Sequence, residues 1–511
     1  MSSEGPVILH IQPPFGGILR LSASTLDRLP AAIRRPRYDR TAVKPGIVHL
    51  GVGAFHRAHQ AVVIDDLLAA GSAEWGIVGA SLRSPETRDA LAPQDCLYTV
   101  AVSSGAGTEI RVIGSLLAME VGNEDPERLI SRMADPATRI VSLTVTEKGY
   151  CHTPQTGELD ETHPDIVHDL ANPHAPRSAP GFLVEALARR KAANLPPFTV
   201  LCCDNLSANG RTVQRIVSRF AELRATDLGR WIEDHAAFPC TMVDRIVPET
   251  TAADRAAIAS ALGMTDAWPV MTEPFTQWIV EDRFTAGRPD FAAAGVQLVS
   301  DVTPFEHMKL RLLNASHSAL AYLGYLAGYE TIAATMTDAS FAALAARIMD
   351  DAAVTLQMPE GTDLAAYQAS LLQRFANPAL HHRTWQIAMD GSQKLPQRLL
   401  GAMRDRLKLG LPIEAHALAV AGWMRYVTAR DERGNAIDVR DPIAAKLKAI
   451  ADEAGPTAER LAPALLAVEP VFGTLGSDPR VASVVTSQLA QLFRLGARRA
   501  VAEQAMAPGT R

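Results

Sequence analysis

Three residues that could take part in proton transfer stand close together in this chain: Lys309, Asn314 and His317. The surrounding residues 305–320 are mostly small or apolar and predict one continuous helix. At about 100° per residue, Asn314 would lie about 140° and His317 about 80° around the helix axis from Lys309. Helical side chains lean toward the N-terminus, so the amide and the imidazole tilt toward the lysine. The spacing therefore allows all three groups to face one cleft.

An amine beside an amide and an imidazole suits acid–base chemistry at an oxygen atom. The amine can take or return a proton, while two hydrogen-bond donors stabilise negative charge on the oxygen. The same residues could equally be a solvated lysine and two hydrogen-bonded polar groups at a domain interface, and spacing alone does not decide between these readings. None of the eight tyrosines begins a Tyr-x-x-x-Lys motif, and no His-Glu-x-x-His or cysteine–histidine cluster predicts a catalytic metal.

Length and composition predict a large globular protein that binds a small molecule. A chain of 511 residues exceeds one ordinary core, so two domains are expected, 1–300 and 301–511, with the boundary where strand signals give way to helical ones. The net charge of -6 and the absence of a basic stripe argue against nucleic acid as a partner.

Neither a membrane nor an oxidising compartment is expected from the sequence. Residues 1–15 contain no continuous apolar segment of the kind found in signal peptides, and no run of about eighteen apolar residues predicts a membrane span. The five cysteines are odd in number and form no Cys-x-x-Cys pair, which fits reduced thiols. We therefore expect a cytoplasmic protein.

Alternating strand and helix patterns predict an α/β fold: an N-terminal, Rossmann-like, mostly parallel sheet domain followed by a mainly α-helical C-terminal domain. The expected strands are 46–53, 75–82, 97–102, 109–113, 139–145, 198–203 and 241–247, and the expected helices between them are 58–70, 181–193 and 210–224. Beyond residue 303 the expected helices are 310–327, 339–350, 364–375, 413–428 and 481–502.

The first strand runs into a glycine turn that suits a dinucleotide. Gly51 and Gly53 precede a helix whose N-terminal amides would attract a pyrophosphate, although His56 stands where the third glycine of the usual fingerprint belongs. Glu86, just after the second strand, is the candidate for the adenosine ribose. It favours NAD, whereas the neighbouring Arg83 could accept the extra phosphate of NADP. The turn predicts NAD and leaves NADP open.

Several longer motifs together resemble the mannitol dehydrogenase family of polyol and sugar-acid dehydrogenases. They span almost the whole chain and comprise 51–60 (Gly-Val-Gly-Ala-Phe-His-Arg-Ala-His-Gln), 144–150 (Thr-Val-Thr-Glu-Lys-Gly-Tyr), 203–205 (Cys-Asp-Asn), 238–246 (Phe-Pro-Cys-Thr-Met-Val-Asp-Arg-Ile), 273–275 (Glu-Pro-Phe) and the Lys309-x4-Asn314-x2-His317 helix.

The resemblance implies a metal-independent dehydrogenase or reductase with a nicotinamide cofactor, acting on a secondary alcohol. The family's catalytic lysine, asparagine and histidine fall on Lys309, Asn314 and His317. Lys309 would be the general base, which requires burial to depress its pKa below the usual value near 10.4. The first motif implies cofactor contacts at Gly51, Gly53, Phe55 and Arg57, and the family's substrate contacts fall on Asn205, Asp244 and Lys394.

Two further stretches, 383–396 and 421–426, resemble the fructuronate reductase branch, which interconverts D-fructuronate and D-mannonate. Gln386 stands where mannitol dehydrogenases have an arginine, which puts mannitol in doubt. A mannitol 2-dehydrogenase or related polyol dehydrogenase remains an alternative, as does a dinucleotide-binding protein without turnover. The small-molecule partner is thus a sugar acid or a polyol, and the oligomeric state stays open.

A sugar acid needs a cation at some distance from Lys309, because the carboxylate of fructuronate lies four carbons from the reacting ketone. Lys148, Arg383 and Lys394 are the candidates, and Arg383 suits a bidentate carboxylate best. Arg311 lies about 200° around the helix from Lys309 and would need another route to the cleft.

Overall fold

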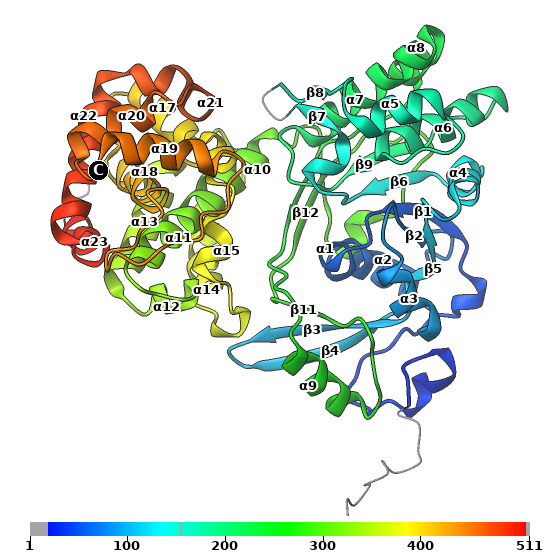
Figure 1. Cartoon of the computed structure of the whole chain (residues 1–511). Helices are drawn as coiled ribbons and strands as arrows, with labels where there is room; N and C mark the ends of the chain where they lie inside the picture. The colour runs from blue at the N-terminus through cyan, green and yellow to red at the C-terminus, as the bar shows by residue number, and fades with distance from the viewer. Residues whose placement is uncertain (1–18, 154–155, 507–511) are drawn as a thin grey trace, which may run out of the picture.

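The computed structural model describes residues 19–153 and 156–506, which form two bodies joined side by side (Figure 1). Every described strand ends by β13 (Gln297–Val299), and α10 (Thr303–Met308) begins the helical body. The expected fold class is confirmed: a Rossmann-like parallel sheet domain precedes a mainly helical one. Residues 1–15, where no signal peptide was expected, lie outside the described residues.

The central sheet has five strands, all parallel, in the order β5-β2-β1-β6-β9. These strands are almost entirely buried, as strands covered by helices on both faces must be. The strands are β1 (Pro45–Leu50), β2 (Gly76–Ser81), β5 (Leu116–Val121), β6 (Ile140–Leu143) and β9 (Thr199–Cys202). The helices of this domain are α1 (Ala54–Ala58), α2 (Gln60–Ala69), α3 (Glu86–Leu91), α4 (Pro126–Ala134), α5 (Pro164–Ala171), α6 (Ala179–Ala192), α7 (Asn209–Arg224), α8 (Thr226–His235) and α9 (Ala252–Leu262).

Two smaller sheets extend this domain toward the helical body. The expected strands 97–102 and 109–113 form, but as an antiparallel hairpin outside the central sheet. The first of these sheets contains β3 (Tyr98–Ser104), β4 (Gly107–Ile113) and β11 (Val270–Thr272), and the second contains β10 (Thr241–Asp244), β12 (Gln277–Glu281) and β13. A short pair, β7 (His152–Thr153) and β8 (Glu158–Leu159), follows the central strand β6. The sequence did not predict β5, β7, β8, β11, β12 and β13.

The helical body surrounds two buried helices, α11 (Ala315–Leu326) and α18 (Glu414–Tyr426), which pack on each other. The expected helix 481–502 is instead two helices, because Gly496 interrupts it at a φ of 77°. The other helices are α12 (Ile332–Met336), α13 (Ala339–Ala353), α14 (Leu364–Phe375), α15 (Thr384–Ala388), α16 (Gly391–Leu395), α17 (Gly401–Lys408), α19 (Ala444–Ala454), α20 (Ala458–Leu466), α21 (Glu469–Phe472), α22 (Pro479–Leu495) and α23 (Ala497–Met506). Among the described helices, none combines the length and the apolar character that crossing a membrane requires.

Two π-helical turns interrupt the helical body and pack against each other. The first, η6 (Lys309–Asn314), joins α10 to α11, and the second, η8 (Pro396–Leu400), joins α16 to α17. The expectation of one regular α-helix over 305–320 is therefore wrong at its centre. A π turn bonds residue i to i+5, so the offset calculated at 100° per residue does not hold between Lys309 and Asn314.

Replacing Gly51 with alanine should destabilise the protein, whereas the same change at Gly53 should not. Gly51 has a φ of 93°, and an added Cβ would lie 2.2 Å from the Thr144 carbonyl oxygen. We expect a loss of at least about 2 kcal/mol in the free energy of unfolding for Gly51→Ala. Gly53 has an ordinary φ of -85°, and its Cβ would meet only the Gly51 oxygen at 3.9 Å. Urea unfolding of both variants tests this, and equal losses would contradict it.

Candidate functional site

Lys309 extends from the helical body into the sheet domain. Its side chain is buried, and Nζ donates hydrogen bonds of 2.7 Å to Asn205 Oδ1 and to the Val243 carbonyl oxygen. Asn205 follows β9 and Val243 belongs to β10, so both acceptors come from strand ends of the sheet domain. The amine is therefore held at the interface between the two domains.

Burial lowers the pKa of Lys309 from its ordinary value of 10.5, and the nearby cations Arg398 and Arg374 lower it further. Asp244 and Glu306 act in the opposite direction. Because burial is the largest of these effects, the ammonium loses its proton more easily than a lysine in water does. This is the property that a lysine needs if it is to act as a base.

A small cavity of about 30 Å³ lies against Lys309 and Asn314. It has room for about one oxygen-sized group. Asn314 shares this cavity with Lys309, so the structure brings together two of the three residues with which the sequence analysis began. The remaining walls come from both domains: Asp204, Asn205, Leu206, Ser207, Thr241, Met242, Val243, Glu306, Leu310 and Gln397.

His317 lies one turn beyond, buried, and does not line that small cavity. Its ring stacks on Phe375 with centroids 5.1 Å apart, and its Nε2 has no hydrogen-bond partner among the described residues. Burial holds the pKa of His317 well below 6.5, so the imidazole is neutral. Arg374 and Arg398 act on both His317 and Lys309, which places the two residues around the same pair of cations.

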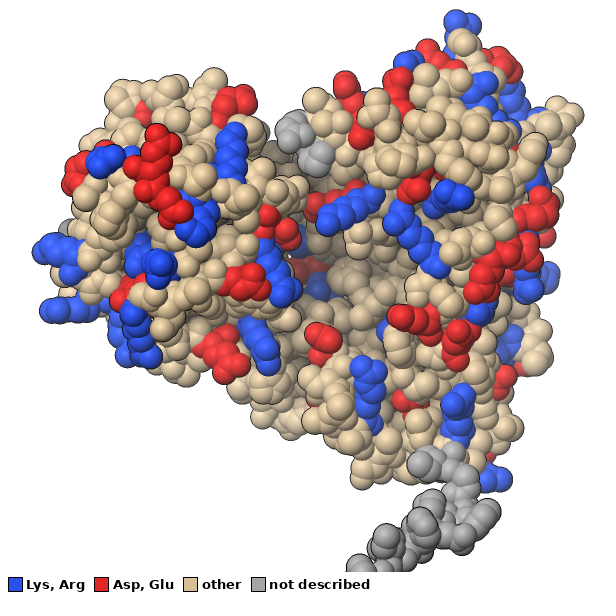
Figure 2. Space-filling model, in the orientation of Figure 1, with Lys and Arg blue, Asp and Glu red and all other residues tan. Residues whose placement is uncertain are grey.

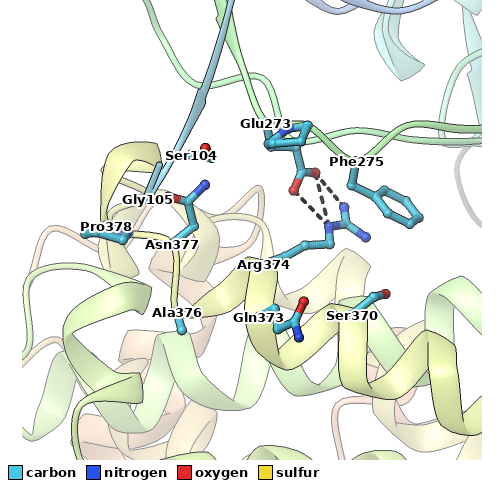
Figure 3. Close-up of a pocket in the computed structure, with 11 residues that line it drawn as sticks. Ser104, Gly105, Glu273, Phe275, Ser370, Gln373, Arg374, Ala376, Asn377 and Pro378 are labelled. Atoms are coloured by element: carbon cyan, nitrogen blue, oxygen red, sulfur yellow. Dashed lines mark hydrogen bonds and ion pairs between the residues drawn. The ribbon is translucent and has the colours of Figure 1, made fainter. Parts of the chain in front are cut away.

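Asp244, expected as a substrate contact, is already bound by a buried arginine. Arg374 holds its carboxylate in a bidentate ion pair with distances of 2.7 and 2.8 Å. The same guanidinium lies 2.7 Å from Glu273 and 4.0 Å above the ring of Phe275. Figure 3 shows Arg374 reaching from α14 to the Glu273 carboxylate. Asp244 therefore acts through its ion pair and has no carboxylate oxygen free of Arg374.

This Asp244–Arg374–Glu273 triad links the two domains, because both carboxylates belong to the sheet domain and the arginine to the helical one. A larger cavity of about 610 Å³ opens beside it, between the tip of the β3–β4 hairpin and α14 (Figure 3). Figure 2 shows the hollow between the two bodies, with charged side chains along its rim. Arg374 was not among the predicted site residues. Its place between Leu371 and Phe375 on the buried face of α14 could have indicated a buried charge.

Two of the expected cations, Lys394 and Arg383, differ in burial. Lys394 is partly buried, with its Nζ donating to the Ile387 carbonyl at 3.3 Å and to that of Met389, and burial lowers its pKa to about 8. Arg383 instead caps α15 at the surface, where its Nε lies 3.9 Å from Glu330. A contact between Arg383 and a substrate carboxylate stays a prediction.

Lys148 is exposed on the short helix η4 (Glu147–Tyr150), which faces the helical body. The neighbouring Glu147 carboxyl interacts with Lys394 and Arg398, so this loop lies across the cleft from them. Arg311 is engaged elsewhere, 2.8 Å from Asp405. The Lys148 amine is therefore free to meet a substrate, whereas the Arg311 guanidinium is already paired.

The glycine turn after β1 fits the pyrophosphate of a dinucleotide. Gly53 is exposed, and the first amides of α1 have no acceptor within the helix. Phe55 stacks on His59 at 5.1 Å beside the turn. Arg57 is different: it is 4 % exposed, lies 5.3 Å from the Tyr98 ring centre and donates to the Trp268 carbonyl. Its guanidinium is engaged within the protein, and a contact between Arg57 and the cofactor stays a prediction.

Glu86 and Arg83 both follow β2, but only one of the two side chains has an ion-pair partner among the described residues. Glu86 is exposed at the start of α3 and has no ion-pair partner among residues 19–153 and 156–506. Arg83 lies 2.6 Å from Asp165, so its charge is already compensated. Asp165 also approaches Cys151 and His163 closely enough for the three to surround an ion, but Arg83 already occupies its carboxylate. Glu86 is thus the freer of the two groups to meet a ribose.

Comparison with known families matches both halves of the chain. Residues 45–293 match the mannitol dehydrogenase Rossmann domain, and residues 301–493 match the mannitol dehydrogenase C-terminal domain. Among curated proteins, the D-mannonate oxidoreductase of Escherichia coli K12 is 49% identical over 93% of this chain and 98% of its own. The mannitol 2-dehydrogenase of Aspergillus fumigatus is 40% identical over 94% of this chain and 97% of its own.

Two solved structures share the whole architecture. Pseudomonas fluorescens mannitol 2-dehydrogenase, in a ternary complex with NAD and D-mannitol, superposes with a TM-score of 0.87 at 39% identity, covering 96% of this chain and all of that one. A D-sorbitol dehydrogenase in substrate-free form superposes with a TM-score of 0.85 at 33% identity, covering 94% of this chain and all of that one.

Removing the interdomain arginine should cost far more stability than removing a surface one. Arg374→Met leaves the carboxylates of Asp244 and Glu273 buried without a cation, so we expect a loss of about 3 to 5 kcal/mol in the free energy of unfolding. Arg288→Met, which breaks a surface pair with Asp282, should lose less than about 1 kcal/mol. Urea unfolding measures both, and losses of similar size would show that the triad does not stabilise the interface.

Proposed function

The chain belongs to the mannitol dehydrogenase family, and from that premise we propose that it is an NAD-dependent oxidoreductase that interconverts D-fructuronate and D-mannonate. The observation that carries this proposal is the buried Lys309 amine, held between Asn205 and Val243 at the domain interface with a lowered pKa. The similarity to a D-mannonate oxidoreductase supports the choice of substrate.

Lys309 acts as the general acid and base of the reaction. In the direction of reduction, the ammonium donates a proton to the oxygen that becomes the alcohol, and in oxidation the free amine takes that proton back. The bound nicotinamide supplies or accepts the hydride. Asn205 Oδ1 and the Val243 carbonyl keep Nζ in place through both directions, since each can accept a hydrogen bond from an amine or an ammonium.

Asn314 and His317 stabilise the reacting oxygen while the proton moves. Asn314 lines the same small cavity as Lys309, and its amide can donate to an oxygen placed there. His317 lies outside that cavity, but its ring is neutral and its Nε2 has no partner among the described residues, so it can donate to a substrate oxygen that reaches it. An oxyanion-hole donor contributes about 3 to 4 kcal/mol.

Gly51, Gly53 and Phe55 would hold the cofactor at the turn after β1, and Glu86 would bind the adenosine ribose. An added side chain at Gly53 would point into open space, as expected where a ligand's phosphate approaches the backbone. The free carboxylate of Glu86 repels a ribose phosphate, which favours NAD over NADP. The paired guanidinium of Arg83 agrees with this preference, because it has another anion to bind.

A mannitol 2-dehydrogenase is the second candidate. The whole chain superposes on an enzyme of that activity, and the acid–base group would be the same lysine. The two candidates differ in what lies at the far end of the substrate, a carboxylate or a hydroxyl. A dinucleotide-binding protein without turnover is disfavoured by the intact set Lys309, Asn314 and His317.

Replacing Lys309 with alanine should abolish most turnover while NAD still binds. We expect kcat to fall by about 10²- to 10⁴-fold, since the base is lost but the glycine turn is intact. Lys448→Ala, which removes an exposed lysine paired with Asp452, is the matched control and should leave kcat unchanged. Nicotinamide absorbance with D-fructuronate, D-fructose and D-mannitol measures turnover, and full activity of the Lys309 variant would exclude the lysine mechanism.

The pH dependence should have opposite signs in the two directions. Oxidation needs the free amine of Lys309, so kcat/KM for D-mannonate should rise with pH and level off above the pKa of that group. Reduction needs the ammonium, so kcat/KM for D-fructuronate should fall over the same range. Both midpoints should lie below the 10.5 of an ordinary lysine, because burial depresses this pKa. A pair of flat profiles would argue against Lys309 as the titrating group.

A further inference from the structure

Two cations of the helical body form no ion pair with a carboxylate among the described residues: Lys394 and Arg398. Lys394 donates to backbone carbonyl oxygens, and Arg398 Nη1 donates to the hydroxyl of Ser318 at 3.0 Å. All three of these acceptors are neutral. Within the described residues, no carboxylate forms an ion pair with either side chain. Glu147 acts on both charges at longer range, and Asp390 and Asp441 act on Lys394 in the same way, although both side chains are partly or fully removed from water.

The two cations lie near Lys309 and His317. Lys394 on α16 and Arg398 on η8 are four residues apart on one continuous helical segment, which becomes π-helical at Pro396. The η8 turn packs against η6, which carries Lys309, and against α11, which carries His317. The charge of Arg398 lowers the pKa of Lys309, His317 and Lys394, so its guanidinium lies close to all three.

Nearby carboxylates do not neutralise this pair. Asp244 is bound to Arg374, and Asp441 accepts hydrogen bonds from Ser392. Asp390 and Glu147 are exposed and form no ion pair in the described part of the chain. Two like charges held close together away from water raise the free energy of each other's charged form. An anionic ligand that binds beside them lowers that free energy. The cluster is therefore built for an anionic ligand.

We propose that Arg398, with Lys394 beside it, binds the carboxylate of the substrate and so selects sugar acids over neutral polyols. This inference rests on the proposed function and names the group that decides between its two candidate substrates. The guanidinium can form two parallel hydrogen bonds to one carboxylate, which an ammonium cannot. With the carboxylate bound there, the ketone four carbons along the substrate would be free to approach Lys309.

The test compares Arg398→Gln and Arg398→Lys with the parent protein on two ketones, D-fructuronate and D-fructose. We expect Arg398→Gln to lower kcat/KM for D-fructuronate by about 100-fold and to change kcat/KM for D-fructose by less than about three-fold. Arg398→Lys keeps the positive charge but loses the pair of parallel donors of the guanidinium. Its kcat/KM for D-fructuronate should therefore lie between those of the parent protein and Arg398→Gln. Arg404→Gln, an exposed arginine on the following helix α17, is the matched control and should match the parent on both ketones.

The outcomes separate this inference from the proposed function. A parent protein that reduces D-fructuronate, with Arg398→Gln losing equally on both ketones, overturns the carboxylate assignment and leaves the function standing. A parent protein that reduces only D-fructose overturns both. Should Arg398→Gln fail to fold, as shown by circular dichroism, Arg398→Lys decides: a raised KM confined to D-fructuronate supports the assignment, and an unchanged KM overturns it.

Discussion

The structure depends on one constraint: charges buried between two domains must find partners across the interface. Lys309 finds neutral acceptors on the sheet domain, and Arg374 finds two carboxylates there. Breaking either set would leave a charge in a poorly solvated space, which costs several kcal/mol. The domains are therefore held in one relative position by the same groups that surround the reacting oxygen. The proposed acid–base role of Lys309 depends on this burial, because burial is what lowers the pKa of the amine.

The two π turns explain how one helical body brings distant residues to that interface. A π turn widens the helix locally and changes which side chains share a face. In η6 it lets Lys309 and Asn314 line one cavity although an α-helix would set them about 140° apart. In η8 it follows Lys394 and carries Arg398 toward α11. Such turns occur often at functional sites, and here both lie in contact with each other at the centre of the cleft.

The sequence predicted the strands that are visible as short apolar runs, and it missed strands that are defined mainly by pairing with distant parts of the chain. Strands β1, β2, β6 and β9 read as short apolar runs because they are buried on both faces. The edge strand β5 contains Ala118, Met119 and Glu120, residues that do not favour strands, and its position depends on pairing with β2. The glycine at position 496 could have marked the break between α22 and α23, since a residue with a φ of 77° ends a helix.

The candidate site shows the same contrast between residues that are close in sequence and residues that only the fold brings together. Lys309, Asn314 and His317 lie within one short stretch, so spacing and family motif could identify them together. Arg374 lies 130 positions from its partner Asp244, and no pattern along the chain joins them. Arg398 is recognisable only because the fold brings it to Lys309 and His317 without a carboxylate. Under the proposed function, the segment that carries the base is separate from η8, so the charges on η8 could change substrate choice without moving Lys309.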